Sequence, residues 1–141
     1  AAFFVYACGP NEVMMHAKRF LIMGALLAMF SVILGAFGAH LLKNVLTDAR
    51  FETFSTAVDY QFWHALGLMI VGITGFKLSS KSWRLAGYLL LAGTLIFSGS
   101  LYLLVATNIG WLGAITPIGG ILMIIGWALF AWSLRTLRIE Q

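Results

Sequence analysis

The side chains in this sequence that could hold a ligand or move a proton are two imidazoles, an amide, a phenol and three aliphatic hydroxyls. They are His40, Gln61, His64, Ser98, Ser100, Tyr102 and Thr116. Imidazoles ligate metals and haem, and polar or ionisable groups inside apolar segments often belong to ligand, ion or proton sites. Gln61 and His64, for example, begin the apolar stretch QFWHALGLMIVGITGF.

Other kinds of catalytic chemistry lack their motifs. No glycine-rich loop follows a strand-like segment, and no serine has the GxSxG context of a nucleophile. No cysteine or carboxylate lies at ligand spacing beside the two histidines. The sequence therefore predicts a non-enzymatic protein with no catalytic residue, no metal and no cofactor. A haem or quinone site at His40 and His64 is a weaker alternative.

The composition indicates whether the surface of this protein faces water or lipid. Of 141 residues, 61% are hydrophobic and 10% are charged, and the mean hydropathy is +0.94. A soluble domain carries about 25% charged residues, so most of this chain is expected to face lipid. The single cysteine, Cys8, cannot form an internal disulfide. The basic residues lie at the ends of apolar segments, which is typical of membrane topology rather than of nucleic-acid binding.

Four apolar stretches are long enough, or nearly so, to cross a membrane, which takes about 20 residues. They cover about residues 20–42, 61–76, 85–106 and 117–134. Lipid offers the backbone no hydrogen-bond partners, so each is expected to be a helix. The predicted fold class is therefore all-α, a polytopic membrane protein with four transmembrane helices in an antiparallel bundle.

The boundaries of two spans have signals of their own. Phe51, Phe54, Val58 and Phe62 recur at steps of three and four, which predicts an amphipathic interfacial helix over 47–60. Thr47 or Asp48 would cap it, and it could run straight into the second span.

At the start of the fourth span, Thr116-Pro117 reads as an N-cap followed by proline in the first turn. A longer helix kinked at Pro117 is the alternative.

Lysine and arginine predict the orientation. One side holds Lys18, Arg19, Lys77, Lys81, Arg84, Arg135 and Arg138. The other side holds Lys43 and Arg50. The positive-inside rule then places both termini in the cytoplasm and the chain in the inner membrane.

This topology brings the polar side chains between His40 and Thr116 to a common depth near the outer surface. We expect His40 and His64 to face the interior and to share one hydrogen-bonded network with Gln61 and Tyr102, because an unpaired polar group facing hydrocarbon is costly. Asp59 is expected at the water boundary. The layer could be a structural network between helices, or a site for a ligand, an ion or a proton.

Small residues should let the helices approach closely. The glycines expected to pack between helices are Gly35, Gly38, Gly67, Gly99, Gly119 and Gly120. The span interiors contain no lysine, arginine, aspartate or glutamate. This argues against a proton-driven transporter built on buried carboxylates.

Residues 1–15 differ from the membrane-spanning part of the chain. Residues 1–15 include Gly9-Pro10 and lack a positively charged start, so they do not form a signal peptide. Met14 or Met15, followed by basic residues and an apolar span, looks like the usual initiator. We therefore expect residues 1–15 to be a dispensable extension and residues 16–141 to be the membrane domain.

Four motifs in order carry a family resemblance. GAFGAH (35–40), TAVDYQFWHALGL (56–68), FSGSLYLL (97–104) and ITPIGG with GW (115–120, 126–127) together resemble the YgdD/YwdK-type small inner-membrane proteins. The resemblance covers about residues 17–132. It implies a four-span membrane protein of a domain family without a settled activity.

The function expected from these observations is that of an accessory or assembly subunit of a larger membrane complex. Its partners would be the lipid bilayer and either other membrane subunits or further copies of itself, with no nucleic acid. The alternative is a small-solute or ion transporter gated by the outer polar layer.

Overall fold

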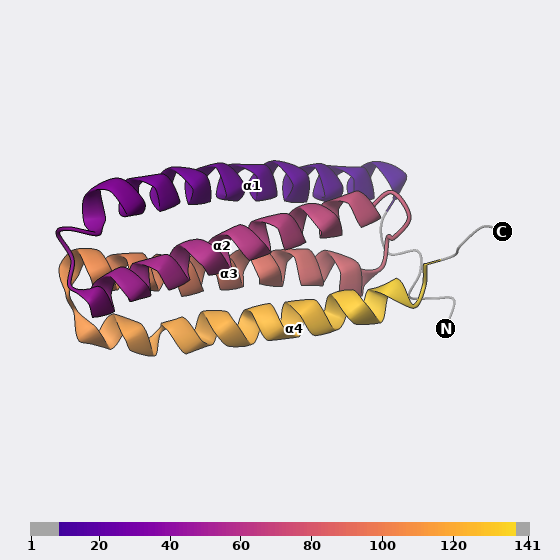
Figure 1. The fold of residues 1–141 in the computed structure, drawn as a ribbon. Coiled ribbons are helices and arrows are strands. Elements are labelled where there is room, and N and C mark those ends of the chain that lie inside the picture. Colours follow the sequence, from indigo (N-terminus) through magenta and orange to yellow (C-terminus); the bar gives the residue numbers. More distant parts are fainter. Residues whose placement is uncertain (1–8, 138–141) are drawn as a thin grey trace.

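The computed structural model describes residues 9–137, and within that range the chain is all-helical, as predicted, with no strand. Successive long helices run in opposite directions (Figure 1). The elements are α1 (Pro10–Phe37), the π-helical turn η2 (Gly38–Leu42), α2 (Asp48–Thr74), α3 (Lys81–Thr107), the 3₁₀ turn η3 (Gly110–Ala114) and α4 (Thr116–Leu134).

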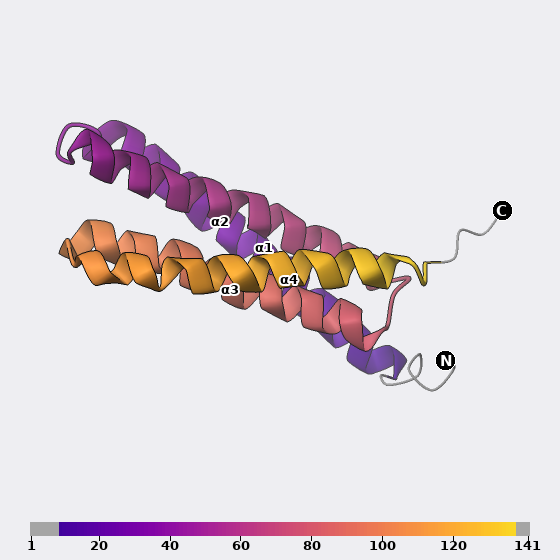
Figure 2. The same cartoon turned by 90° about the horizontal axis from the view of Figure 1, so that it is seen from below.

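The helices associate as two pairs. α1 packs along α2 and α3 packs along α4, while α2 also contacts α3. The start of α1, the α2–α3 connection and the end of α4 lie together, and we call this the basic end. The α1–α2 and α3–α4 connections form the opposite end, toward which the two pairs diverge (Figure 2).

Three helical segments are long and apolar enough to cross a membrane: Pro10–Leu42, Lys81–Thr107 and Gly110–Leu134. α2 is not among them. Its first half carries charged residues such as Asp48, Arg50 and Asp59, which lower its hydropathy. The prediction of four helices is confirmed for the described residues, whereas three of them qualify as spans by length and composition.

The helix predicted over 47–60 runs straight into the second predicted span, as the sequence allowed, and together they form the single helix α2. The Thr47 side chain caps this helix by accepting a hydrogen bond from the backbone N–H of Arg50 at 3.3 Å, as predicted. Phe54 is buried and lies against Gly38, the first residue of η2. Part of the apolar stripe therefore faces a neighbouring helix.

α1 begins well before the predicted span. It starts at Pro10, inside the segment expected to be an extension, and Val13 belongs to the hydrophobic core with 6% of its surface exposed. α1 therefore runs continuously through the proposed boundary at residue 15. The first eight residues of the extension, including Cys8, lie outside the described range. With η2, the segment has 33 residues, about 50 Å at 1.5 Å per residue, which exceeds a hydrocarbon core of about 30 Å.

α4 begins at Thr116 with Pro117 in its first turn, which confirms the shorter of the two helices considered for this segment. The predicted cap is wrong, however, because the N-cap position is Ile115 and no side chain caps the helix. The hydroxyl of Thr116 instead bonds Ser100 on α3.

The best-packed part of the core lies toward the basic end. Phe20 on α1 is fully buried and meets Trp83 and Tyr88 of α3 edge-on, with ring centroids 5.5 and 4.9 Å away. Gly87 leaves the space that the Phe20 ring occupies. Trp83 donates its indole N–H to the carbonyl of Val71 at 2.8 Å. These contacts tie α1, α2 and α3 together where the helix pairs are closest.

The glycines expected to pack between helices differ in what they contact. A Cβ at Gly119 would lie 2.5 Å from the backbone nitrogen of Phe97, so α3 and α4 approach closely there. Gly38 faces Phe54, and Gly35 and Gly120 have ordinary contacts with Val58 and Phe97. Gly99 was expected to pack against a helix, but no atom lies within 4 Å of its Cβ position.

Candidate functional site

Gln61 joins three helices near the opposite end. Its side-chain Nε2 donates to the carbonyl of Leu27 on α1 at 2.9 Å, and its Oε1 accepts a hydrogen bond from the Tyr102 hydroxyl on α3 at 2.7 Å. Gln61 is buried. The predicted pairing of Gln61 with Tyr102 is confirmed, and the amide uses both of its ends to hold helices together.

His64 is bonded at both ring nitrogens. Trp127 on α4 donates its indole N–H to Nε2 at 3.1 Å, and Nδ1 lies 2.7 Å from the carbonyl of Tyr60. An indole nitrogen is a donor only, so Nε2 must accept and the ring proton is assigned to Nδ1, which donates to Tyr60. Neither nitrogen of His64 is left to ligate a metal or haem in this arrangement.

The predicted network does not form as one unit, because His64 bonds Trp127 and Tyr60 rather than Gln61 or Tyr102. His40 joins neither group, contrary to the sequence prediction. It is exposed on η2 and makes no hydrogen bond or ion pair with another residue between positions 9 and 137. Two positions earlier, Gly38 is buried against Phe54. Residues two positions apart in a helix face opposite sides, so the packing of Gly38 turns His40 away.

The hydroxyls form separate links between helices. Ser98 on α3 donates to the carbonyl of Ala57 on α2 at 2.7 Å. Ser100 and Thr116 bond each other at 2.7 Å between α3 and α4. The predicted layer is therefore several independent links rather than one network. Asp59 is exposed.

A groove opens between α1 and α3 beside the Gln61–Tyr102 bond. It has a volume of about 480 Å³ and an almost entirely apolar lining. We call it the α1–α3 groove; its lining includes Phe30, Ile33 and Leu34 of α1 and Leu95, Gly99 and Tyr102 of α3. The helix pairs diverge in this region (Figure 2).

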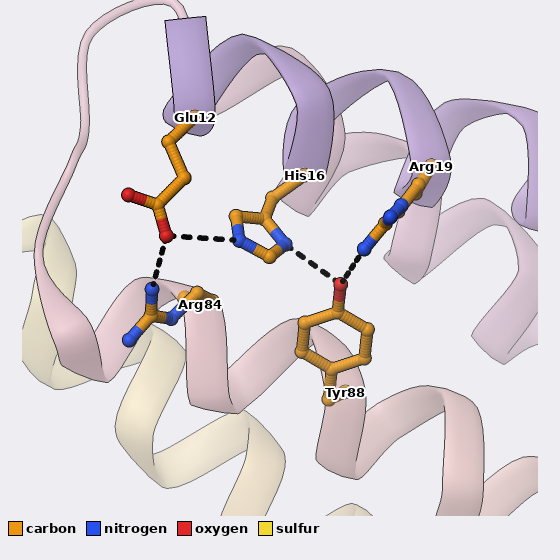
Figure 3. Close-up of polar contacts among 5 residues, drawn as sticks. All are labelled: Glu12, His16, Arg19, Arg84 and Tyr88. Carbon is orange, nitrogen blue, oxygen red and sulfur yellow. Dashed lines mark hydrogen bonds and ion pairs between the residues drawn. The ribbon is translucent and has the colours of Figure 1, made fainter. Parts of the chain in front are cut away.

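A second polar cluster, at the basic end, was missed by sequence reasoning. Glu12, His16 and Arg19 extend from α1 toward Arg84 and Tyr88 of α3 (Figure 3). The Tyr88 hydroxyl lies 2.7 Å from His16 Nδ1 and accepts a hydrogen bond from Arg19 at 3.3 Å. Glu12 pairs with Arg84 at 3.3 Å and lies 3.9 Å from His16 Nε2.

The environment of His16 disfavours a charged imidazole. This residue precedes the apolar stretch that begins near Phe20, so it lies outside the predicted span. Burial, followed by the positive charges of Arg84 and Arg19, lowers the pKa of His16 below its ordinary value of 6.5, while Glu12 acts in the opposite direction. The Nε2 edge of His16 faces the Glu12 carboxylate, which can only accept, so the ring proton is assigned to Nε2 and the Tyr88 hydroxyl donates to Nδ1.

The sequence did contain a signal for this cluster. Glu12 and His16 are four residues apart, as are Arg84 and Tyr88, so each pair shares one helix face. The signal is hidden because Glu12 falls in the predicted extension and Tyr88 in a predicted apolar span.

Comparison with known proteins identifies the family. A family model described as "Protein of unknown function (DUF423)" matches residues 34–120, more than half of the chain. The chain belongs to this family. The match contains the Gln61–Tyr102 and Ser100–Thr116 links, whereas Trp127 and the α1 residues of the basic-end cluster lie outside it.

The relatives of this family member are named as membrane proteins. A UPF0382 membrane protein of Staphylococcus haemolyticus is 51% identical over 117 residues, which cover 82% of this chain and 94% of the relative. The UPF0382 membrane protein YwdK of Bacillus subtilis is 49% identical over 111 residues, 78% of this chain and 90% of the relative. These matches confirm the resemblance seen in the sequence and identify an integral membrane protein. No solved structure matches.

Proposed function

We propose that the protein is a non-enzymatic, four-span inner-membrane protein that acts as an accessory or assembly subunit of a larger membrane complex. One observation carries this proposal. Every buried side-chain nitrogen or oxygen between residues 9 and 137 already has a hydrogen-bond partner. Polar groups that bind a substrate or an ion must be available to it, whereas these groups are already bonded within or between the helices.

The distribution of charge supports the proposed topology. Lys18 and Arg19, the α2–α3 connection with Lys77 and Lys81, and Arg135 after α4 all lie at the basic end. Arg138 lies outside the described residues. Lys43 and Arg50 lie at the opposite end. This arrangement favours both termini in the cytoplasm, with α2 returning through the membrane between α1 and α3.

Gly99 supports a partner in the membrane. A glycine inside a helix is less favourable than alanine by about 0.5–1 kcal/mol, unless a close neighbour requires it. No atom of the chain lies within 4 Å of the Gly99 Cβ position, and Gly99 lines the α1–α3 groove. Small residues at an open groove suit close approach by another transmembrane helix. We propose that a partner helix packs there.

Substitution of Gly99 tests this function without disturbing the internal packing. Gly99→Trp would fill the α1–α3 groove, while Ile124→Trp places the same indole side chain on α4 at a residue that is 70% exposed. Both variants should unfold at the temperature of the wild type. We expect wild type and Ile124→Trp to co-purify with the same membrane proteins in mild detergent, and Gly99→Trp to lose them.

The possible results separate the alternatives. Retention of the partners by Gly99→Trp would contradict the use of the groove as the contact surface. If a photo-crosslinker at residue 95 or 99 captures only a second copy of the chain, or only lipid, the accessory function is wrong. Uptake of a solute by vesicles containing the purified chain alone would instead establish the transport alternative.

A further inference from the structure

A second cavity lies at the basic end, on the side of α1 away from the Glu12–His16 cluster. Its volume is about 530 Å³, within the range of about 300–1,000 Å³ that is typical of small-molecule sites. We call it the Lys18 pocket. Its lining includes Asn11, Met14, Lys18 and Leu21 of α1, and Phe76 after α2.

The lining of the Lys18 pocket combines two kinds of surface. Lys18 offers an ammonium group and Asn11 a side-chain amide, whereas Met14, Leu21 and Phe76 offer apolar surface. Lys18 makes no ion pair with any residue between positions 9 and 137. The neighbouring Arg19, in contrast, donates to Tyr88. The Lys18 charge is therefore open to an external anion.

The depth of the pocket matches the boundary between lipid headgroups and hydrocarbon. Lys18 lies two residues before the apolar stretch that begins at Phe20, and Phe76 ends the apolar stretch of α2. The polar part of the lining thus lies on the water side of this boundary. Leu21 lies one turn further along α1, on the hydrocarbon side.

We propose that the Lys18 pocket binds an anionic phospholipid. The lipid phosphate would bind the Lys18 ammonium and the Asn11 amide beside Met14, and the first part of an acyl chain would pack on Leu21 and Phe76. Charge selects an anionic headgroup, because lysine and arginine dominate the basic end and its described acid, Glu12, is paired with Arg84. Anionic lipids of the cytoplasmic leaflet attract such basic surfaces.

Thermal unfolding of the purified full chain in a neutral detergent tests the proposal. A ligand that binds the folded state raises the unfolding temperature. We expect dioleoylphosphatidylglycerol to raise it by about 3 °C or more above the rise given by dioleoylphosphatidylcholine. Lys18→Gln should abolish this difference between the two lipids. The matched variant Lys43→Gln, at the opposite end, should retain it.

Two further measurements distinguish a phospholipid site from a site for a free anion. Met14→Trp, at a residue that is 44% exposed, should fill the pocket and reduce the retention of phosphatidylglycerol in native mass spectrometry. Inorganic phosphate and glycerophosphoglycerol, which lack acyl chains, should give no stabilisation. Equal effects of the two lipids, an unchanged difference in Lys18→Gln, or stabilisation by inorganic phosphate alone would each overturn the proposal.

Discussion

Trp127 on α4 donates its indole N–H to Nε2 of His64 on α2, across a distance of 3.1 Å. The same indole ring lies over Gly67, one turn further along α2, where a Cβ would come within 2.7 Å of it. His64 in turn donates through Nδ1 to the backbone of Tyr60. One aromatic side chain thus both bonds and packs against α2, and it links the two helix pairs.

Removal of the indole N–H should destabilise the protein measurably. Trp127→Phe keeps much of the ring but leaves His64 Nε2 without its donor. A buried group that loses its partner costs about 1–3 kcal/mol, although hydrogen bonds between transmembrane helices average about 0.6 kcal/mol, so we expect a loss near 1 kcal/mol. Denaturant unfolding in micelles measures it. Trp111→Phe, at an exposed site on η3, should have no effect.

A methyl group at Gly67 should lower the stability of the folded protein, while one at Gly99 should not. Gly67→Ala places a Cβ against the Trp127 ring, and overpacking of this kind costs about 1–3 kcal/mol. Gly99→Ala meets open space and should leave stability unchanged or raise it by about 0.5–1 kcal/mol through the better helix propensity of alanine. Equal effects at the two positions would contradict the packing described for Trp127.

Acidification should weaken the basic end through His16. Burial and the charges of Arg84 and Arg19 lower the pKa of this imidazole in the folded protein below 6.5, so the unfolded chain binds more protons as the pH falls through that value. The stability contributed by neutral His16 is complete above pH 6.5 and is lost below it.

The unfolding temperature of the wild type should therefore fall between about pH 7.5 and pH 5.5. His16→Gln removes the titrating group and should reduce that fall. Glu12, which faces the same imidazole, opposes the effect, so Glu12→Gln should enlarge it. A pH dependence that is identical in wild type and His16→Gln would contradict this role.

Truncation to Met14 should destabilise the protein, although the sequence predicted that the preceding residues are dispensable. The truncation removes Val13 from the core and Glu12 from its ion pair with Arg84. Burial of a valine side chain contributes about 1.5 kcal/mol. Val13→Ala should reproduce part of the loss, and Met15→Ala, at an exposed position of the same helix, should not. Thermal unfolding of the three proteins provides the comparison.

The proposed topology has a direct test. Reporter fusions at Ser80 and Gln141 should both give a cytoplasmic signal, because most lysine and arginine residues lie on that side. A fusion at Asn44, between α1 and α2, should report the other side. A cytoplasmic signal from Asn44 would show that α2 does not return through the membrane.

Hydropathy and charge predicted which residues lie at the same end of the helices better than the direction in which those residues face. The Gln61–Tyr102 pair was predictable, because an amide and a phenol at the same depth on apolar helices need partners. His40 lies at a similar depth, but its direction depends on the packing of Gly38 against Phe54. That contact is between helices and leaves no periodic pattern in the sequence.

Two other differences have the same origin. The stripe of Phe51, Phe54 and Val58 would suit a membrane surface or a neighbouring helix equally well, and only the position of α1 decides between them. Trp127 belongs to a family motif in the sequence, but its role depends on Gly67 of another helix. Pairwise geometry of this kind follows from the assembled helices and not from a single segment.

The pairing of α1 with α2 and of α3 with α4 has a consequence for biogenesis. Helices that are neighbours in sequence can meet as soon as both have left the ribosome, so in the four-span topology proposed above each pair would enter the membrane as a hairpin. The bonds from Tyr102 to Gln61, from Trp127 to His64 and from Ser98 to Ala57 join one hairpin to the other. They cannot form until the second hairpin has arrived. The first hairpin therefore waits with Gln61 and His64 incompletely paired, and this is the stage of synthesis at which an insertase or chaperone would protect the chain.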